Sequence, residues 1–319
     1  MKNNKTIISI VGETASGKTA AAFQLANYLI EINSCSGVDI ISADSRQVYK
    51  DIAVLSGADI PEGFNQKTEQ GLLPFLEKSS IRLHGVGILE ANKEWSLGQF
   101  QRFALKLIDE ALVQNRKVII VGGTGLYHMQ LFQTESRLRV PPNIELREKA
   151  EKMSLEELQN WLSQLDPSRI AKMNNSDLQN PRRLVRAIEQ GLEAGDTKPS
   201  VELINPKYSH KIIGIRSQTS ELKLKIAERV KNRFDGGAVQ EVKKLRDFLE
   251  LASGIKTTLG FKNIESFLDG DINEDECIKS WVVSELKYAK RQRTWWKPIS
   301  NIEWVDDVKA QNMYTRVVC

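Results

Sequence analysis

Histidine and cysteine are scarce in this chain of 319 residues, which contains three of each. The cysteines, Cys35, Cys277 and Cys319, are far apart and odd in number. Neither a disulfide framework nor the close Cys/His spacing of a zinc site is therefore expected. No apolar run approaches the roughly 20 residues of a membrane span, and the N-terminal residues lack the apolar core of a secretory signal. We expect a cytoplasmic protein that does not cross a membrane.

The chain also lacks a strong excess of charge of either sign. Its formal net charge is +4 at pH 7, and its 41% hydrophobic and 27% charged residues are ordinary for a globular protein. A mild positive charge permits binding of nucleic acid without establishing it. The places where Lys and Arg cluster along the chain are therefore more informative than their sum.

Four apolar segments predict buried parallel strands. They are continuous runs without alternation, as expected of strands that helices cover on both faces. They occupy Thr6–Gly12, Val38–Asp44, Lys117–Gly125 and His210–Ser217. Helical spacing of apolar residues follows at Lys18–Ile32 and at Ser96–Asn115, where Ser96 is the expected N-cap. This alternation predicts a doubly wound α/β sheet.

The middle of the chain has a different character. Residues 137–203 are rich in Glu, Lys, Leu, Arg and Gln and predict helices at 143–153, 154–165 and 180–195 without a strand-like run. Residues 196–208 are the expected return linker. We therefore predict an all-helical insertion domain at 137–203, within a core made of residues 1–136 and 204–319.

The first predicted strand leads into a glycine-rich loop with the sequence Gly12-Glu13-Thr14-Ala15-Ser16-Gly17-Lys18-Thr19. It matches G-x-x-x-x-G-K-[ST] and stands between a strand and a helix, as this motif requires. Backbone N–H groups and the helix N-terminus can bind phosphates there, Lys18 adds a full charge, and the Thr19 hydroxyl can reach a magnesium ion. The alternative is a glycine turn without a ligand. The loop predicts phosphate binding in a P-loop NTPase-like fold, but it does not show whether the phosphates belong to a nucleotide.

Asp44 and Thr124 follow two of the predicted strands. Carboxyl ends of parallel strands line the ligand crevice of a doubly wound sheet, so both residues should lie beside the phosphate loop. Asp44 could ligate magnesium, act as a base or cap the next helix. Thr124 could bind the reacting end of a substrate or simply belong to a tight turn. Gly122 stands where an ATPase would carry an acidic residue, which argues against a hydrolase.

Basic residues cluster in two segments, Asn180–Arg186 ("NPRRLVR") and Tyr288–Lys297 ("YAKRQRTWWK"). Basic side chains can neutralise backbone phosphates, and exposed aromatic rings can stack on bases. The alternative is solvated helix faces, with Trp295 and Trp296 packed in the core. Two clusters on different parts of the chain indicate a large polyanionic partner.

In their order along the chain, these segments resemble the tRNA dimethylallyltransferases, also called tRNA isopentenyltransferases. The similar stretches are GETASGKT, ISADSRQVY, VGGTGLY, DPSRIAKMNNSDLQNPRRLVRAIE, TTLGFKNIESFLDGDINEDECI and AKRQRTWWK. Glu13 replaces the usual proline of the loop, and we expect its side chain to point to solvent or to pair with a nearby basic residue. The lysine-proline and histidine-pair elements that usually follow the second motif are missing. The stretch after Arg233 is also shorter than usual.

The resemblance implies transfer of a dimethylallyl group from dimethylallyl diphosphate to the N6 amine of the adenosine 3′-adjacent to the anticodon. It implies that Gly12 to Thr19 hold the donor diphosphate, with Mg2+ on Thr19. Asp44 would take the proton of the amine, while Thr124 and Arg233 assist at the reacting bond. A monomer that binds the anticodon stem-loop is expected. The implied tRNA contacts are Asp44, Ser45, Arg46, Gln47, Arg182, Arg183, Leu184, Arg186, Lys290, Arg291, Gln292, Arg293 and Trp295.

Three other functions share part of this pattern. A prenyltransferase acting on free AMP, ADP or ATP has the first three motifs, but it does not explain the helical insertion or the C-terminal basic segment. A small-molecule P-loop kinase does not explain the two basic clusters. An RNA-binding protein with a decayed site is favoured by the missing elements. It is opposed by the presence of Lys18, Thr19, Asp44 and Thr124 together.

Overall fold

The computed structural model describes residues 6–135, 140–194, 201–203, 208–248 and 250–306. The chain divides into two compact units, one made of Met1–Leu131 with Asn205–Cys319 and the other of Phe132–Ile204. Each unit is described by itself. Among the described residues, no helix has both the length and the apolar character needed to span a bilayer.

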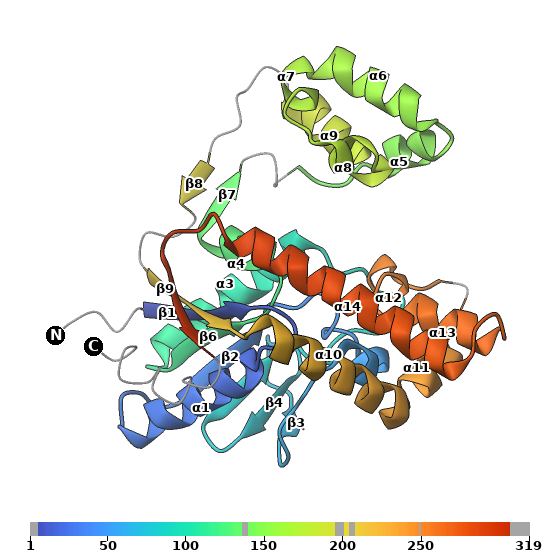
Figure 1. Ribbon diagram of the computed structural model, residues 1–319. Coiled ribbons are helices and arrows are strands. Elements are labelled where there is room, and N and C mark those ends of the chain that lie inside the picture. Colours follow the sequence, from blue (N-terminus) through green and yellow to red (C-terminus); the bar gives the residue numbers. More distant parts are fainter. Residues whose placement is uncertain (1–5, 136–139, 195–200, 204–207, 249, 307–319) are drawn as a thin grey trace. The chain divides into compact units, whose positions relative to one another are not determined.

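A mixed, largely parallel sheet forms the centre of the first unit (Figure 1). Its strands are β1 (Thr6–Gly12), β2 (Val38–Ser42), β3 (Asn65–Lys67), β4 (Phe75–Lys78), β5 (Ile81–His84), β6 (Lys117–Val121), β9 (Ser209–Arg216) and β10 (Ile302–Asp306). Over the described residues the sheet has eight strands in the order β10-β9-β1-β6-β2-β5-β4-β3. The strands from β10 to β5 pair in parallel, and β4 and β3 continue the edge as antiparallel strands.

The predicted strands are confirmed as β1, β2, β6 and β9, and they are the central part of the sheet. β1 pairs with β6 and β9 at once, so that Ile8 lies opposite both Ile119 and Lys211. Their continuous apolar runs follow from cover on both faces. The edge strands were not predicted, because they are short and mix polar with apolar residues, as in Asn65–Lys67.

Helices cover both faces of this sheet. α1 (Lys18–Glu31) packs on one face, where Leu25 and Ala26 meet Ile8 and Ile10 of β1. α3 (Leu97–Val113) covers the other face (Figure 1). α3 begins with the predicted N-cap, because Ser96 forms a capping box with Gln99. The short α4 (Gly125–Phe132) follows β6. The predicted α/β class with a doubly wound core is therefore confirmed.

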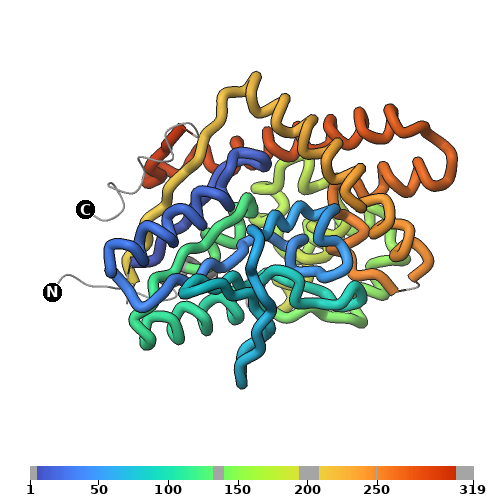
Figure 2. Tube along the Cα trace, turned by 90° about the horizontal axis from the view of Figure 1, so that it is seen from below, coloured from blue at the N-terminus to red at the C-terminus, as the bar shows by residue number. Residues whose placement is uncertain are grey.

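The C-terminal part of the first unit forms a second hydrophobic core together with the segment after β2, and this core is helical. Its members are η1 (Lys50–Ile52), α2 (Ala53–Ser56), α10 (Thr219–Arg233), the π-helical turn η3 (Phe234–Ala238), α11 (Val239–Leu245), α12 (Ser253–Lys256), α13 (Phe261–Leu268) and α14 (Glu274–Trp296). Trp281 is fully buried at its centre. A capping box between Asn273 and Glu276 starts α14. α10 and α14 lie side by side in both views (Figure 1 and Figure 2).

The second unit contains the helices α5 (Ile144–Glu151), α6 (Leu155–Leu165), α7 (Pro167–Ile170), α8 (Asn175–Leu178) and α9 (Pro181–Ala194). The predicted helices correspond to α5, α6 and α9. α7 and α8 are single turns, started by side-chain caps from Asp166 and Asn174. Strands β7 (Gln133–Glu135) and β8 (Val201–Leu203) pair antiparallel, so part of the expected linker is a strand. The rest of that linker, except Tyr208, lies outside the described residues, as does Gly195.

A buried chain of hydrogen bonds joins β1, α4 and β9. Ser9 Oγ lies 3.1 Å from His128 Nδ1 and 2.7 Å from His210 Nε2. His128 Nε2 lies 3.2 Å from the Gly122 carbonyl, which can only accept, so Nε2 carries the proton and Nδ1 accepts from Ser9. Burial lowers the pKa of His128 to about 3 and the pKa of His210 to about 4. Both imidazoles are therefore neutral at pH 7.

We expect the free energy of unfolding to fall as the pH drops from about 6.5 toward 4. The folded pKa of each histidine lies below its unfolded value, so the unfolded chain binds more protons in this window. The stabilisation is complete above the unfolded pKa and is lost as the pH falls through the folded values. Chemical denaturation at pH 7 and pH 5 checks this, with His128→Gln as the matched variant. An equal loss of stability in both proteins would contradict the assignment to His128.

Candidate functional site

The phosphate loop joins β1 to α1 through two glycines in unusual backbone conformations. Gly12 has φ +146° and Gly17 has φ +81°. A Cβ on Gly12 would lie only 2.4 Å from the Ile215 carbonyl oxygen of β9. The loop can therefore turn at Gly12 only without a side chain. α1 begins at Lys18, which places the positive end of its dipole at the loop.

Lys18 is held inside this loop. Its ammonium donates to the carbonyl of Glu13. Burial, and next the nearby Arg229 guanidinium, lower the pKa of Lys18 to about 7. A bound anion would favour the charged form again, because an opposite charge raises the pKa of an amine. An anionic ligand at the loop would therefore be paired with a fully charged Lys18.

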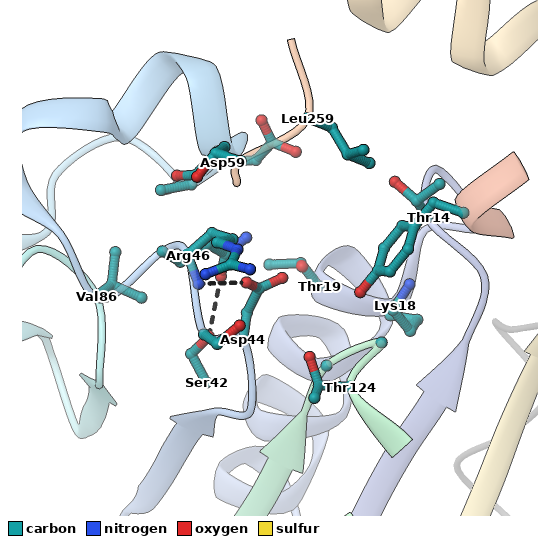
Figure 3. Close-up of a pocket in the computed structure, with 18 of the residues that line it drawn as sticks. Thr14, Lys18, Thr19, Ser42, Asp44, Arg46, Asp59, Val86, Thr124 and Leu259 are labelled. Atoms are coloured by element: carbon teal, nitrogen blue, oxygen red, sulfur yellow. Dashed lines mark hydrogen bonds between the residues drawn. The ribbon is translucent and has the colours of Figure 1, made fainter. Parts of the chain in front are cut away.

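The loop opens onto a cavity of about 350 Å³. Lys18, Thr19, Asp44 and Thr124 surround a common space there (Figure 3). A larger cavity of about 860 Å³ adjoins it and shares Lys18, Thr19 and Arg229 in its wall. Both volumes lie in the range of small-molecule sites. The structure thus brings together Lys18, Thr19, Asp44 and Thr124, as predicted from the strand ends.

Asp44 follows β2 and lines the cavity with its neighbours Ser45, Arg46 and Gln47. Its Oδ1 accepts a hydrogen bond from the Arg46 N–H at 2.8 Å (Figure 3). One carboxylate oxygen therefore caps the turn that follows β2, where a helix cap had been considered. The bond uses only one of the two oxygens, so capping does not exclude a role as base or ligand.

Thr124 follows β6 and lines the cavity together with Tyr288 of α14. Burial, followed by the charge of Asp44, raises the pKa of Tyr288 to about 12, so this phenol is neutral at pH 7. The Arg291 guanidinium lies 5.5 Å from the centre of the Tyr288 ring. The sequence pattern had placed Tyr288 in a basic-aromatic cluster. The fold places it in the cavity wall, next to Thr124.

Two arginines of α10, Arg229 and Arg233, line both cavities. Spacing of four residues puts them on the same face of the helix. Arg229 donates to Thr14 Oγ1 at 3.3 Å and to Asp59 at 2.7 Å. Sequence reasoning found Arg233 and missed Arg229, although the Arg-x-x-x-Arg spacing was a usable signal.

Arg233 is buried and bonded to a buried carboxylate. Its guanidinium donates to Glu285 Oε1 of α14 at 3.0 Å, and its Nε has no partner among the described residues. Burial, and then the charge of Arg229, lower the pKa of Arg233 to about 10, so it remains a cation at pH 7. Together with Lys18, these arginines concentrate positive charge beside the phosphate loop. Glu285 was not predicted, because nothing local distinguishes it from other glutamates of α14.

Side chains of α14 explain why two positions of the segment "VGGTGLY" are occupied by glycine. A Cβ on Gly123 would lie 1.9 Å from Gln292 Nε2, and one on Gly125 would lie 1.8 Å from the Trp295 indole. Gln292 is buried, and its Oε1 accepts from the Thr14 N–H at 2.7 Å. These glycines therefore allow α14 to approach the sheet closely, and Gln292 joins the loop after β6 to the phosphate loop.

The residues predicted to contact tRNA differ in how far their side chains are exposed to solvent. Arg182, Arg183, Lys290 and Arg291 are exposed, and so is Trp295, at 44%. Leu184 is fully buried in the core of the second unit, so its side chain is unavailable to a partner in the described structure. That correction follows from the 3.6-residue helix period, which turns Leu184 inward when Arg182 and Arg183 face out.

Several of the remaining predicted contacts already have protein partners. Arg186 pairs with Glu189 at 2.9 Å, and Gln292 bonds to the phosphate loop as described. Arg293 pairs with Glu13, which is 4% exposed. Glu13 was expected to face solvent or to pair with a basic residue, and the pairing is confirmed. Trp296 is buried in the core, whereas Trp295 lies at the surface.

The oxygens beside the loop suit a magnesium ion bound together with phosphates. The described residues contain no cluster of three or more His, Cys, Asp or Glu that would bind a metal by itself. The Thr19 hydroxyl and the Asp44 carboxylate line the cavity. Mg2+ typically takes one or two protein oxygens and completes its shell with phosphate and water. The donor set therefore fits such an ion.

The fold and this site define an α/β protein in which a P-loop and an aspartate line one cavity. Residues 73–298 match the family model described as IPP transferase. The tRNA dimethylallyltransferase of Halothermothrix orenii is 31% identical over 311 residues, covering 95% of this chain and 88% of the relative. The chain therefore belongs to the tRNA dimethylallyltransferase family, and the resemblance seen in its motifs is confirmed.

Solved structures agree with this membership. The structure of a tRNA isopentenylpyrophosphate transferase from Bacillus halodurans superposes with a TM-score of 0.65 at 26% identity, covering 98% of this chain and 96% of that one. A eukaryotic dimethylallyltransferase, studied while acting on tRNA, has a TM-score of 0.74 at 21% identity, covering 98% of this chain and 78% of that one. At this lower identity the likeness concerns the fold.

Proposed function

We propose that this protein transfers the dimethylallyl group of dimethylallyl diphosphate to N6 of the adenosine 3′-adjacent to the anticodon in tRNA, and releases diphosphate. One observation carries the proposal: a single cavity joins a phosphate loop to Asp44 and Thr124. Relatives of this chain are named tRNA dimethylallyltransferase, which supports transfer of a dimethylallyl group to tRNA. We place the reaction in the cytoplasm and expect a monomer.

The donor diphosphate binds to the loop N–H groups, Lys18, Arg229 and Arg233. As the carbon–oxygen bond breaks, the leaving diphosphate gains negative charge. Positive groups that are already in place stabilise this charge without reorganisation. Glu285 holds the Arg233 guanidinium in position at 3.0 Å. Mg2+ on the Thr19 hydroxyl, when bound, adds charge neutralisation at the diphosphate.

The acceptor is a weak nucleophile, because the lone pair of the adenine amine is delocalised into the ring. Formation of the new carbon–nitrogen bond makes the amine proton acidic, and Asp44 takes that proton as a general base. Thr124, which lines the cavity together with Tyr288, binds the donor oxygen near the reacting carbon or steadies the amine. Asp44 thus removes the proton of the acceptor, while the cationic groups stabilise the charge of the leaving diphosphate.

The target base must leave its stack, at a cost of a few kcal/mol. Exposed side chains on α14, namely Lys290, Arg291 and Trp295, are suited to offset this cost by phosphate and base contacts. Arg182 and Arg183 offer the same chemistry on α9. We propose that the helical insertion domain, residues 137–203, serves as a clamp for the anticodon arm.

Incubation with radiolabelled dimethylallyl diphosphate and Mg2+ tests the function. The acceptors are an intact tRNA with adenosine after the anticodon, its isolated anticodon stem-loop, and AMP. We expect label in both RNAs and none in AMP. Label in AMP alone would replace the proposal with a free-nucleotide prenyltransferase. Phosphate transfer from ATP to a small molecule, without any prenyl transfer to RNA, would show a kinase instead.

A further inference from the structure

Two consecutive residues of the phosphate loop are held by two consecutive residues of α14. The Glu13 carboxylate accepts from Arg293 Nε, and the Thr14 N–H donates to Gln292 Oε1 at 2.7 Å. Arg293 also donates to Thr219 Oγ1, at the start of α10, at 3.2 Å. Side chains of α14 therefore connect the phosphate loop to the C-terminal helices.

The positive charge of Arg293 balances the negative charge of the Glu13 carboxylate. Glu13 is only 4% exposed, and its second oxygen, Oε2, is buried without a hydrogen-bond partner in the described residues. A buried carboxylate is costly unless a cation is bonded to it. Arg293 is the cation in contact with it, and the Arg293 side chain itself is 48% exposed.

The backbone of Glu13 acts on the ligand-binding lysine. The Glu13 carbonyl accepts from the Lys18 ammonium and from the Ser16 N–H, the latter at 3.3 Å. A contact from Arg293 to the Glu13 side chain therefore holds the peptide group that orients Lys18. This gives a continuous path from the C-terminal basic segment to the charge that faces the donor.

We propose that Arg293 is a positioning residue of the donor site, acting through Glu13 on Lys18, and that it is not an RNA contact. The inference rests on the proposed function only in taking the loop as the site of the donor diphosphate. Without Arg293, Glu13 would be an unpaired buried anion next to a site for another anion. Its carboxylate would repel the diphosphate, and its carbonyl would no longer hold Lys18.

Arg293→Met keeps the length of the side chain and removes the cation. We expect the affinity for inorganic diphosphate with Mg2+, measured by calorimetry, to fall by on the order of tenfold. The KM for dimethylallyl diphosphate should rise in parallel. kcat at saturating donor and the Kd for an anticodon stem-loop should stay close to the wild-type values. Lys287→Met removes an exposed positive charge from the same helix and should leave all four quantities unchanged.

A double variant separates positioning from loss of folding. Glu13→Gln with Arg293→Met removes both charges and should recover most of the diphosphate affinity. Failure of this rescue would overturn the inference. So would an Arg293→Met protein that binds diphosphate normally but RNA weakly. A wild-type protein that prenylates no RNA would refute the proposed function, yet the diphosphate measurements would still decide the role of Arg293.

Discussion

Replacement of Asp44 by asparagine should reduce prenyl transfer by about 10²–10⁴-fold, the usual contribution of a positioned base. Asparagine has nearly the same shape but cannot accept the amine proton at neutral pH. Single-turnover transfer to an anticodon stem-loop measures the loss, and fluorescence anisotropy measures RNA binding. RNA affinity should change little, because the exposed basic side chains are untouched.

The two functions of Asp44 can be separated with a second variant. Asparagine can still accept the Arg46 N–H bond through its side-chain oxygen, whereas Asp44→Ala removes both the base and the cap of the turn. We expect both variants to lose transfer, and only Asp44→Ala to lose thermal stability. Retained transfer by Asp44→Asn would remove Asp44 from the role of base.

Lys18→Met should lower kcat/KM for dimethylallyl diphosphate by about 10²–10³-fold, as found when one preorganised group facing a developing anion is removed. The ammonium is held in the loop by the Glu13 carbonyl. Lys18→Arg should not restore activity, since the planar guanidinium is larger and differs in geometry. Steady-state kinetics with the donor varied at saturating RNA measures both variants.

Lys223→Met is the matched control for charge removal, because Lys223 is exposed on α10 and lines neither cavity. It should behave as wild type. An unchanged kcat/KM in Lys18→Met would mean that the diphosphate binds away from Lys18, and so outside both cavities. In that case the assignment of the loop as donor site would be wrong.

Much of this site could be predicted because its elements are local in sequence. The phosphate loop is a continuous segment whose glycines, lysine and threonine have set spacings. Asp44 and Thr124 could be placed beside it, because parallel strands end at one edge of the sheet. The central strands were evident from continuous apolar runs, which only strands buried on both faces display.

Other parts could not be predicted, because they depend on contacts between distant segments. Thr14 and Gln292 meet across 278 residues of sequence, and Glu13 and Arg293 across 280. The basic composition of the segment around Arg293 suggested RNA contact for all of its charges. In the structure Gln292 is buried against the phosphate loop and Arg293 pairs with Glu13, whereas Lys290 and Arg291 are exposed.

By itself, the sequence determined the phosphate loop, the central strands, the helical character of the insertion and the family of this protein. The first three are matters of spacing and periodicity, which are properties of neighbouring residues, and the family follows from the resemblance of six ordered segments. The tertiary structure alone decided which face of α14 is turned to the loop, because that depends on how Trp281 and Trp296 pack in the core. It thereby decided that Arg229, Glu285 and Tyr288 belong to the reacting cavity. It also decided that Glu13 has a cation beside it.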